Sequence, residues 1–313
     1  MPLLRRKSVL AAKIESTSGT AEALTASDAA FNVFDLTMSP TIAMTPRPSQ
    51  GSFSSLPAMP ELYGGTCTFR TEIFGTGAGG VPGWASTFLP ACGWTAAGGV
   101  FSPKSETPGG AGGVKTITIG AFVDGNRMLM RGCAGTFLIT FETGKIAVIN
   151  WTFTGVFSGQ SAVALLAPTY PTALPLRVGN ATFTLGSWSP CFQSMTIDAG
   201  NTVALRECAT NTDSSGYAAA IITNRLPTGS INPEAELDGT KDNYDIWTST
   251  TEEALAFSIE NATDKFAVAA PKLQRTNVQM GDRNGMLTDE ITFQLNKSAA
   301  AGNDELTFTF SAP

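Results

Sequence analysis

From residue 66 to the end of the chain, apolar and polar side chains alternate in short runs, which glycine, proline, asparagine and aspartate interrupt. A period of two residues is typical of β-strands, because successive side chains point to opposite faces of a sheet. Short breaks between such runs indicate turns between neighbouring strands. The pattern predicts strands at residues 66–74, 116–123, 127–130, 136–142, 146–157, 181–188, 192–198, 202–208, 217–223, 255–260, 266–270, 273–280, 288–296 and 306–310.

Turns and short helices fill the breaks in this pattern. Asp124-Gly125 separates two predicted strands and is the strongest short hairpin signal in the chain. Residues 143–145 are a second predicted turn, and residues 95–113 are rich in Gly and Pro and are predicted to be a loop. Residues 82–92 begin with proline and carry a helical apolar face, so they predict a short helix. Residues 232–234 (Asn-Pro-Glu) predict the cap of a second helical turn.

The chain is therefore predicted to be mainly β, with one or two small helices. Residues 1–60 lack the alternation, and five prolines break up their short apolar pieces. We expect them to form an irregular arm that packs on something else.

Composition excludes several classes of chemistry. Charged residues make up 15% of the 313 residues, so Ser, Thr, Asn, Gln and Gly must cover much of the surface. Histidine is absent, which excludes Ser-His-Asp and Cys-His nucleophile systems and any zinc site with imidazole ligands. We expect a protein that is not an enzyme and that uses no cofactor and no metal.

The cysteines and the apolar runs bear on the compartment. An odd number of cysteines, widely spaced and without a C-x-x-C pair, fits neither a disulfide framework nor a thiolate metal site. No stretch approaches the 18 apolar residues of a membrane span, and the apolar run at 9–12 is too short for a signal peptide. We expect a protein that is made in the cytoplasm and has no membrane partner. The cysteines, expected to be small buried side chains, are Cys67, Cys92, Cys133, Cys191 and Cys208.

Charge is distributed unevenly along the chain. One interpretation is that the basic start of one subunit contacts an acidic segment of the next, which would orient head-to-tail assembly; the alternative is two solvated surface stretches. On the first interpretation, deleting residues 2–13 leaves a folded protein that no longer forms long assemblies. The basic residues are Arg5, Arg6, Lys7 and Lys13, and the candidate acidic partners are Glu234, Glu236, Asp238, Asp242 and Asp245.

Two motifs suggest ligand sites, and their context argues against both. Residues 75–80 fit G-x-G-x-x-G, but no β-α-β unit surrounds them, so a tightly turned glycine loop is the better interpretation. Residues 238–245 are acidic but lack the alternating spacing of a calcium loop. A pI of about 4.8 leaves no broad basic surface for holding nucleic acid.

Two further classes stay open at this point. A hydrolase could use paired carboxylates, with Glu252 and Glu253 beside Asp245, although adjacent residues of a strand point to opposite faces. A secreted carbohydrate-binding β-sandwich is the other class, suggested by the five tryptophans.

Several stretches, in this order, resemble the tail tube (major tail) proteins of long-tailed bacteriophages and related prophages. The resemblance is scattered over nearly the whole chain and depends on the order and spacing of the stretches. They are residues 4–20 (LRRKSVLAAKIESTSGT), 63–65 (YGG), 82–94 (PGWASTFLPACGW), 153–155 (FTG), 224–234 (NRLPTGSINPE), 281–285 (GDRNG) and 302–306 (GNDEL).

The resemblance implies a fold and an assembly. The fold would be an antiparallel β-sandwich or half-barrel with one or two short flanking helices, and subunits, usually six, would close into a ring with a shared inner β-barrel. Residues 1–60 would be an extended arm that contacts neighbouring subunits, and residues 61–313 the tail-tube β domain. Because 313 residues exceed the minimal tube protein, residues of about 159–240 would be an insertion or an outer decoration.

The implied function is structural. Stacked rings would form the conduit through which the genome passes into the host, so the protein would belong to the virion tail and be assembled in the host cytoplasm. Its partners would be other copies of itself, the tape measure, tail terminator and distal tail proteins, and DNA in transient, non-specific passage. Residues 146–157 and 116–130 are candidates for the lumen wall. The alternative within the virion is a distal tail or baseplate ring protein that does not polymerise.

Overall fold

The computed structural model describes residues 4–105, 114–211, 213 and 215–313. Strands account for 56% of the structure and helices for 6%, which confirms the prediction of a mainly β, antiparallel protein with two short α-helices. The elements are β1 (Ser8–Ile14), η1 (Ala26–Ala29), β2 (Val33–Pro48), β3 (Ser55–Glu72), α1 (Gly83–Ala91), β4 (Trp94–Ala97), β5 (Val100–Pro103), β6 (Ile117–Val123), β7 (Asn126–Glu142), β8 (Val148–Ala162), β9 (Thr182–Leu185), β10 (Phe192–Asp198), β11 (Asn201–Glu207), β12 (Tyr217–Arg225), β13 (Thr228–Pro233), α2 (Asn243–Thr248), β14 (Glu252–Glu260), β15 (Lys265–Arg283), β16 (Met286–Leu295) and β17 (Thr307–Ser311).

Within the described residues, fifteen of these strands belong to one antiparallel sheet, and β11 and β12 form a separate two-stranded sheet. The main path runs β2-β3-β8-β7-β10-β13-β16-β15-β17-β5-β4. Strand β7 is long enough to hold β6 and β10 on the same side at different points along its length. Strand β15 in the same way pairs with β14, β16 and β17.

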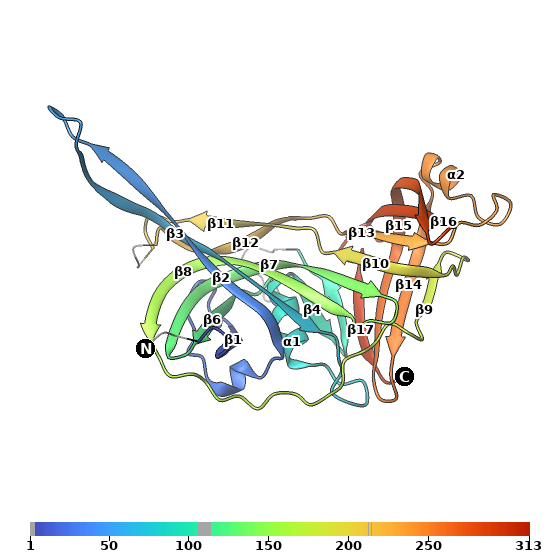
Figure 1. The fold of residues 1–313 in the computed structure, drawn as a ribbon, viewed down its shortest axis with the longest axis horizontal. Helices are drawn as coiled ribbons and strands as arrows, with labels where there is room; N and C mark the ends of the chain where they lie inside the picture. Colours follow the sequence, from blue (N-terminus) through green and yellow to red (C-terminus); the bar gives the residue numbers. More distant parts are fainter. Residues whose placement is uncertain (1–3, 106–113, 212, 214) are drawn as a thin grey trace.

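The N-terminal half of the sheet curves around α1 (Figure 1). Strands β1, β6, β7, β8, β3 and β2 are hydrogen-bonded in that order, and β1 and β2 are the two ends of the curve. Inside it, the ring of Phe88 on α1 lies 4.9 Å from Phe69 and 5.4 Å from Trp151, centroid to centroid. Trp84, Phe88 and Leu89 are all buried, as the helical spacing predicts. The apolar face of α1 therefore fills the curved half of the sheet.

The same core continues into the C-terminal half of the molecule. Phe141, near the end of β7, lies 4.5 Å from Phe257 on β14, measured between ring centroids. Phe266 on β15 stacks on Phe308 of β17 at 5.9 Å. These residues and those around α1 belong to one contiguous cluster of buried apolar side chains, so the described chain has a single main core that spans both halves.

The predicted hairpin at Asp124-Gly125 is confirmed. Both residues have positive φ angles, 43° and 99°, and Val123 pairs with Asn126 across the turn. Two successive positive φ angles define the turn that matches the right-handed twist of neighbouring strands, and the Asp-Gly sequence tolerates them. Asn284 and Gly285, with φ angles of 55° and 85°, make the same kind of turn between β15 and β16.

The prediction that residues 1–60 are irregular is wrong. They contain β1, whose residues 9–12 are buried, and β2, and the proposed boundary at residue 60 cuts through β3. The strand β2 was missed because of its prolines: Pro40, Pro46 and Pro48 suggest interrupted secondary structure. They are tolerated because β2 is an edge strand, where a missing N–H can face away from the sheet.

Three local predictions also need correction. Residues 95–113 were predicted as loop, but residues 95–103 belong to the β4–β5 hairpin, and residues 106–113 lie outside the described residues. Residues 228–233 form β13 between β10 and β16 and not a helix start. The Asn232 side chain accepts the backbone N–H of Ser194 at 2.7 Å, so it joins two strands and does not cap a helix.

Residues 159–240 do not form a separate unit. Strand β9 pairs with β14, β10 pairs with β7, and β13 pairs with β16, so all three belong to the main sheet. The part that stands apart within this range is the β11–β12 ribbon, residues 201–225, which has its own two-stranded sheet. An outer decoration in this chain is therefore limited to that ribbon.

Candidate functional site

One face of the central sheet is made of hydroxyl and amide side chains. On β3, β8, β7, β10, β13 and β16, side chains alternate between the core and this second face, which we call the polar sheet face. Register confirms the alternation: Thr68, Thr152 and Thr136 are aligned across three strands, and the next residues along, such as Trp151 and Phe137, are in the core. Its uncharged polar members are Thr66, Thr68, Thr136, Thr140, Asn150, Thr152, Thr154, Ser194, Thr196, Thr228, Ser230, Asn232, Thr292 and Gln294.

Cross-strand hydrogen bonds connect the side chains of this face. The Oγ atoms of Thr196 and Ser230 are 2.8 Å apart, and Thr140 and Thr292 continue the same row on the strands to either side. At the β15 side, the Gln294 amide donates to Gln274 Oε1 at 3.0 Å. The groups of this face thus bond to each other. The β11–β12 ribbon covers part of the face, where the backbone N–H of Asn201 donates to the Thr136 hydroxyl at 3.3 Å.

The charged residues on the polar sheet face are mostly acidic. In the described part of β3, β8, β7, β10, β13 and β16, the cations are Arg70, which forms a 3.1 Å ion pair with Asp35, and Arg127 and Arg131 near the start of β7. Arg131 is aligned with Val156 of this face and is buried. The acids of the face are Glu72, Glu142, Asp198 and Glu290. Affinity for nucleic acid depends on contacts between cationic side chains and phosphates. Because this surface has no row of cations, it offers phosphates few such contacts.

The two predicted lumen segments have different outcomes. Residues 146–157 supply Asn150, Thr152 and Thr154 to the polar sheet face. Residues 116–130 do not, because β6 is buried on both sides between β1 and β7. Arg131, the cation that follows this segment, is also buried and donates to the carbonyl of Ala218 at 3.1 Å and to the carboxylate of Asp213.

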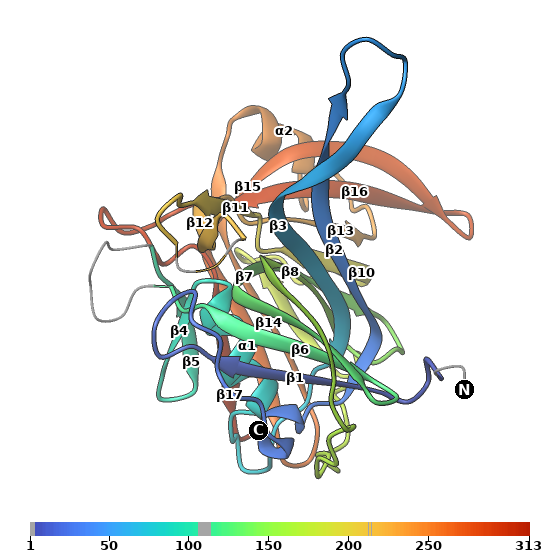
Figure 2. The same cartoon turned by 90° about the vertical axis from the view of Figure 1, so that its left-hand side faces the viewer.

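A long ribbon made of β2 and β3 projects from the body (Figures 1 and 2). Its outer part, residues 42–59, pairs only with itself. It nevertheless carries exposed apolar side chains, and a two-stranded ribbon has no core in which to bury them. An exposed apolar patch of this kind marks an interaction site. The exposed apolar residues are Ile42, Met44, Phe53, Leu56 and Met59.

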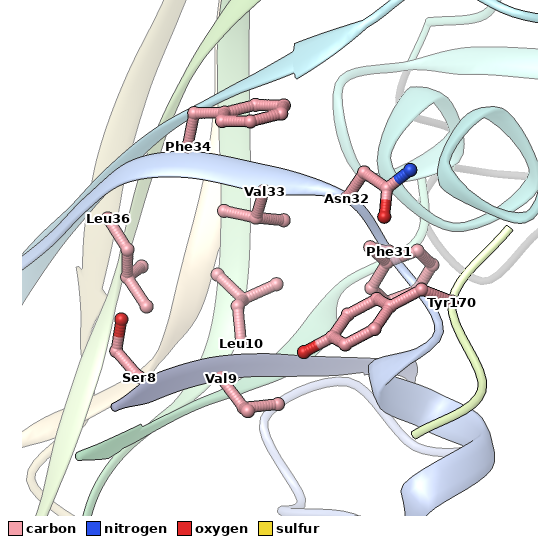
Figure 3. Close-up of a pocket in the computed structure, with 9 residues that line it drawn as sticks. All are labelled: Ser8, Val9, Leu10, Phe31, Asn32, Val33, Phe34, Leu36 and Tyr170. Carbon is pink, nitrogen blue, oxygen red and sulfur yellow. The ribbon is translucent and has the colours of Figure 1, made fainter. Parts of the chain in front are cut away.

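A pocket of about 180 Å³ opens where β1 and β2 face each other without pairing. Figure 3 shows Leu10 of β1 pointing toward Val33 and Leu36 of β2, with Tyr170 closing one side. None of the nine lining residues, all in the described chain, is an Asp, Glu, Lys, Arg or Cys. The pocket therefore presents apolar side chains beside the polar groups of Ser8, Asn32 and Tyr170, and no pair of carboxylates for general acid–base chemistry.

The predicted basic and acidic residues are partly paired within the chain. Lys13 binds Glu22 at 3.1 Å and Lys7 approaches Asp124 at 3.6 Å. Of the acidic candidates, Glu234 pairs with Arg283 at 2.5 Å. The expectation that residues 2–13 are dispensable for folding is wrong, because this deletion removes most of buried β1.

The remaining acidic candidates surround α2. Glu236 accepts the indole N–H of Trp188 at 3.0 Å, and Asp242 caps α2 by accepting the backbone N–H of Asp245. Asp238 lies beside Asp242, whose carboxylate raises the pKa of Asp238. In the part of the chain that the structure describes, no salt bridge is formed by Arg5, Arg6, Asp238 or Asp245.

The paired carboxylates of the hydrolase hypothesis are engaged elsewhere. Glu252 binds Lys272 at 2.9 Å, a contact that lowers the pKa of Glu252. Glu253 binds Lys241 at 2.6 Å and Arg275 at 2.7 Å. Both carboxylates are thus engaged by cations of the same chain, and the lowered pKa of Glu252 keeps that group from acting as a proton donor.

Two buried polar clusters were not predicted. Glu15 is buried and accepts the Thr118 hydroxyl at 2.9 Å and the Gly132 N–H at 2.7 Å. Arg275 is buried on β15, where it joins Glu253 to Asn243 of α2. No sequence signal marks them: Glu15 is followed by Ser16 and Thr17, and Arg275 lies between Gln274 and Thr276, so the burial of both follows from tertiary packing alone.

The cysteine prediction is confirmed for three residues and wrong for two. Cys67, Cys92 and Cys133 are buried thiols, whereas Cys191 is exposed and Cys208 is half-buried. Burial raises the pKa of Cys67 to about 12.

The glycine-rich motif that suggested a ligand site makes contacts within the chain. The glycine loop at 75–80 wraps around Asp264, whose carboxylate accepts the N–H of Gly77 at 2.9 Å. Among the described residues, no group of three or more Cys, Asp or Glu side chains could hold a metal ion. No helix in the described chain is long and apolar enough to span a membrane.

Comparison with protein families and with curated proteins gave no match to this sequence.

Proposed function

We propose that this protein is a structural subunit of the tail tube of a long-tailed bacteriophage, in which six identical copies form each of the stacked rings. The observation that carries the proposal is the projecting β2–β3 ribbon, whose exposed apolar side chains have no place to pack within their own subunit. The sequence also resembles those of tail tube proteins, which supports the same class of protein.

The partner of the ribbon in this proposal is another copy of the chain. Strand β2 is an open edge over its full length, and an open edge invites pairing with another strand. Closure of subunits into a ring satisfies such edges without leaving new ones. A projecting ribbon that reaches a neighbour would also link one ring to the next.

In the ring, the polar sheet face would line the lumen as part of a shared inner β-barrel. Hydroxyl and amide side chains keep water at the wall, and the acidic excess repels phosphates. DNA would then pass without being held at any sequence. This role requires no catalytic group, cofactor or metal, and the protein would act within the virion tail after assembly in the host cytoplasm.

Other tail proteins would meet the tube at its ends and inside it. The tape measure protein would occupy the lumen before DNA passes, and the tail terminator and distal tail proteins would cap the two ends. A distal tail or baseplate ring protein, the alternative function, shares the ring but not the stacking.

The ribbon provides the test. We expect Phe53→Ser combined with Met59→Ser to leave the subunit folded, because both side chains are exposed on the ribbon, and to abolish rings and tubes in electron micrographs. The matched control is Leu174→Ser with Leu226→Ser, which removes two exposed apolar side chains elsewhere on the surface. Tubes formed by the ribbon variant as readily as by the wild type would contradict the proposal.

A further inference from the structure

Two complementary surface features lie at opposite ends of the molecule. In Figure 1, where the longest axis is horizontal, the N-terminus lies at the left and α2 at the right. A groove lies beside the N-terminal residues, and an exposed loop, residues 236–242, precedes α2. Features at opposite ends cannot meet within one subunit, but they can meet between successive copies.

The groove is lined by apolar side chains and by the two arginines that precede β1. It has a volume of about 920 Å³ and adjoins the pocket of Figure 3, with which it shares Val33 and Leu36. Met128 extends its apolar lining, and Arg5 and Arg6 also line it. Neither guanidinium forms a salt bridge with any residue that the structure describes, so both are free to bind an acidic ligand.

Asp35 is the one acid that lines the groove. Its carboxylate is already bound to Arg70 at 3.1 Å. The groove therefore favours an occupant that brings both an apolar side chain and its own negative charge.

The loop before α2 has this combination. Leu237 is 83% exposed, although leucine gains free energy by burial, and it stands between Glu236 and Asp238. The carbonyl of Leu237 accepts the backbone N–H groups of Thr240 at 2.7 Å and Lys241 at 3.1 Å, which closes a tight turn behind the leucine. The loop thus presents one apolar side chain flanked by two carboxylates.

The base of the loop is fixed, so its tip is held in place before any contact. Lys241 binds Glu253 at 2.6 Å, and its ammonium lies 5.6 Å from the centre of the Trp188 ring. Trp188 in turn donates to Glu236 at 3.0 Å. A loop that is already ordered loses little conformational entropy when it binds.

A second acid lies beside Asp238 at the tip. The carboxyl group of Asp238 hydrogen-bonds the side chain of Asp242, a contact that raises the pKa of Asp238. Together with Glu236, these side chains make the tip acidic, so a cation brought by a neighbouring subunit would bind there.

We propose that the loop at residues 236–242 of one copy docks in the groove of the next copy, with Leu237 in the apolar interior and Asp238 against Arg5 and Arg6. The contact is heterologous, since it joins two different surfaces, and it repeats from copy to copy in a ring or along a stack. It rests on the self-assembly of the proposed function and specifies which surfaces meet.

Charge reversal on both sides tests this contact. We expect Arg5→Glu with Arg6→Glu to weaken self-association about tenfold in sedimentation velocity of the full-length protein, and Asp238→Arg to do the same. A chain that carries all three changes should recover most of the loss, because the charges are then exchanged. The control is Lys115→Glu with Lys297→Glu, which alters net charge equally at exposed sites outside the groove.

The outcomes separate this contact from the proposed function. Association of the groove variant at wild-type strength would overturn the contact. Failure of the triple variant to recover association would overturn it as well. In either case, tubes formed by the wild-type protein would leave the proposed function standing. Wild-type protein that stays monomeric at every concentration would overturn both. Circular dichroism of each variant checks the fold, which we expect to be unchanged because Arg5, Arg6 and Asp238 are exposed.

Discussion

Arg275 donates to the carboxylate of Glu253 at 2.7 Å, and the side chain of Arg275 is completely buried. The second oxygen of Glu253 binds Lys241 at 2.6 Å, and Arg275 also donates to Asn243 at 3.0 Å. This cluster fixes α2 and the loop before it to the sheet. A buried charge is tolerated only while its partners remain, so the cluster is a point of high sensitivity.

We expect Glu253→Ala to destabilise the protein by about 3 to 5 kcal/mol, because it leaves the Arg275 guanidinium buried without its carboxylate. Chemical denaturation of the variant and the wild type measures the change. The control is Asp35→Ala, which breaks the exposed pair with Arg70 and should cost about 1 kcal/mol or less. Equal effects of the two substitutions would contradict the burial of Arg275.

Glu22 predicts a specific pH dependence. The Ser16 hydroxyl, the Ser16 backbone N–H and Lys13 bind its carboxylate and lower the pKa of Glu22 from 4.5 to about 2. Because the pKa is lower in the folded state, the ionised carboxylate stabilises the fold at pH values above 4.5. This contribution is lost as the pH falls from 4.5 to about 2.

We therefore expect Glu22→Gln to be less stable than the wild type at pH 7, with the difference disappearing between pH 4.5 and 2. Urea unfolding at a series of pH values provides the measurement, and Glu207→Gln, at an exposed carboxylate of β11, controls for the loss of one charge. A difference that stays constant down to pH 2 would rule out the lowered pKa.

The thiols should divide into two classes. At neutral pH, iodoacetamide should label Cys191 and Cys208 in the native protein, and Cys67, Cys92 and Cys133 only after unfolding. Hydrogen bonding to Thr210 lowers the pKa of Cys208, so its reaction should begin at a lower pH than that of an ordinary thiol. Mass spectrometry of digests identifies the labelled sites, and native labelling of Cys92 would contradict the core described above.

Lysine substitutions should make the polar sheet face bind DNA. Thr140→Lys with Thr196→Lys places two cations opposite each other on adjacent strands. We expect assembled variant tubes to bind DNA in a salt-dependent manner, whereas wild-type tubes do not, because binding follows the number of phosphate contacts. Fluorescence anisotropy with labelled DNA measures this.

The matched control for this experiment is Thr202→Lys with Asn224→Lys. These residues also oppose each other, but on the separate β11–β12 sheet. DNA binding by the control as strong as by the Thr140/Thr196 variant would show that the lysines act by charge alone, and would contradict a lumen lined by the polar sheet face.

Much of the β structure after residue 66 could be predicted, since alternation and turn residues act locally. The Asp124-Gly125 hairpin is an example, and the buried face of α1 was predicted from a local pattern in the same way. The β2–β3 ribbon could not be predicted, because its prolines are acceptable only at an open edge, which depends on tertiary context. The β13 strand was missed for a similar reason: Asn232 caps a helix in isolation, but here two neighbouring strands compete for it.

The candidate sites divide in the same way. Sequence identified the charge asymmetry that includes Arg5, Arg6 and Asp238, because clusters of charge are visible in one dimension. It did not show that Lys13 and Glu234 are paired within the chain, nor that Thr68, Thr152 and Thr136 share a row, since both follow from strand register. Register is set by contacts between distant residues.

Negative-stain electron microscopy of the purified wild-type protein over a concentration series tests most directly whether copies of this chain assemble into stacked rings. We expect stacked rings or tubes with a central channel, which lengthen as concentration rises. Isolated single rings at every concentration would contradict the tube and favour a baseplate ring, and a monomer at every concentration would contradict self-assembly altogether.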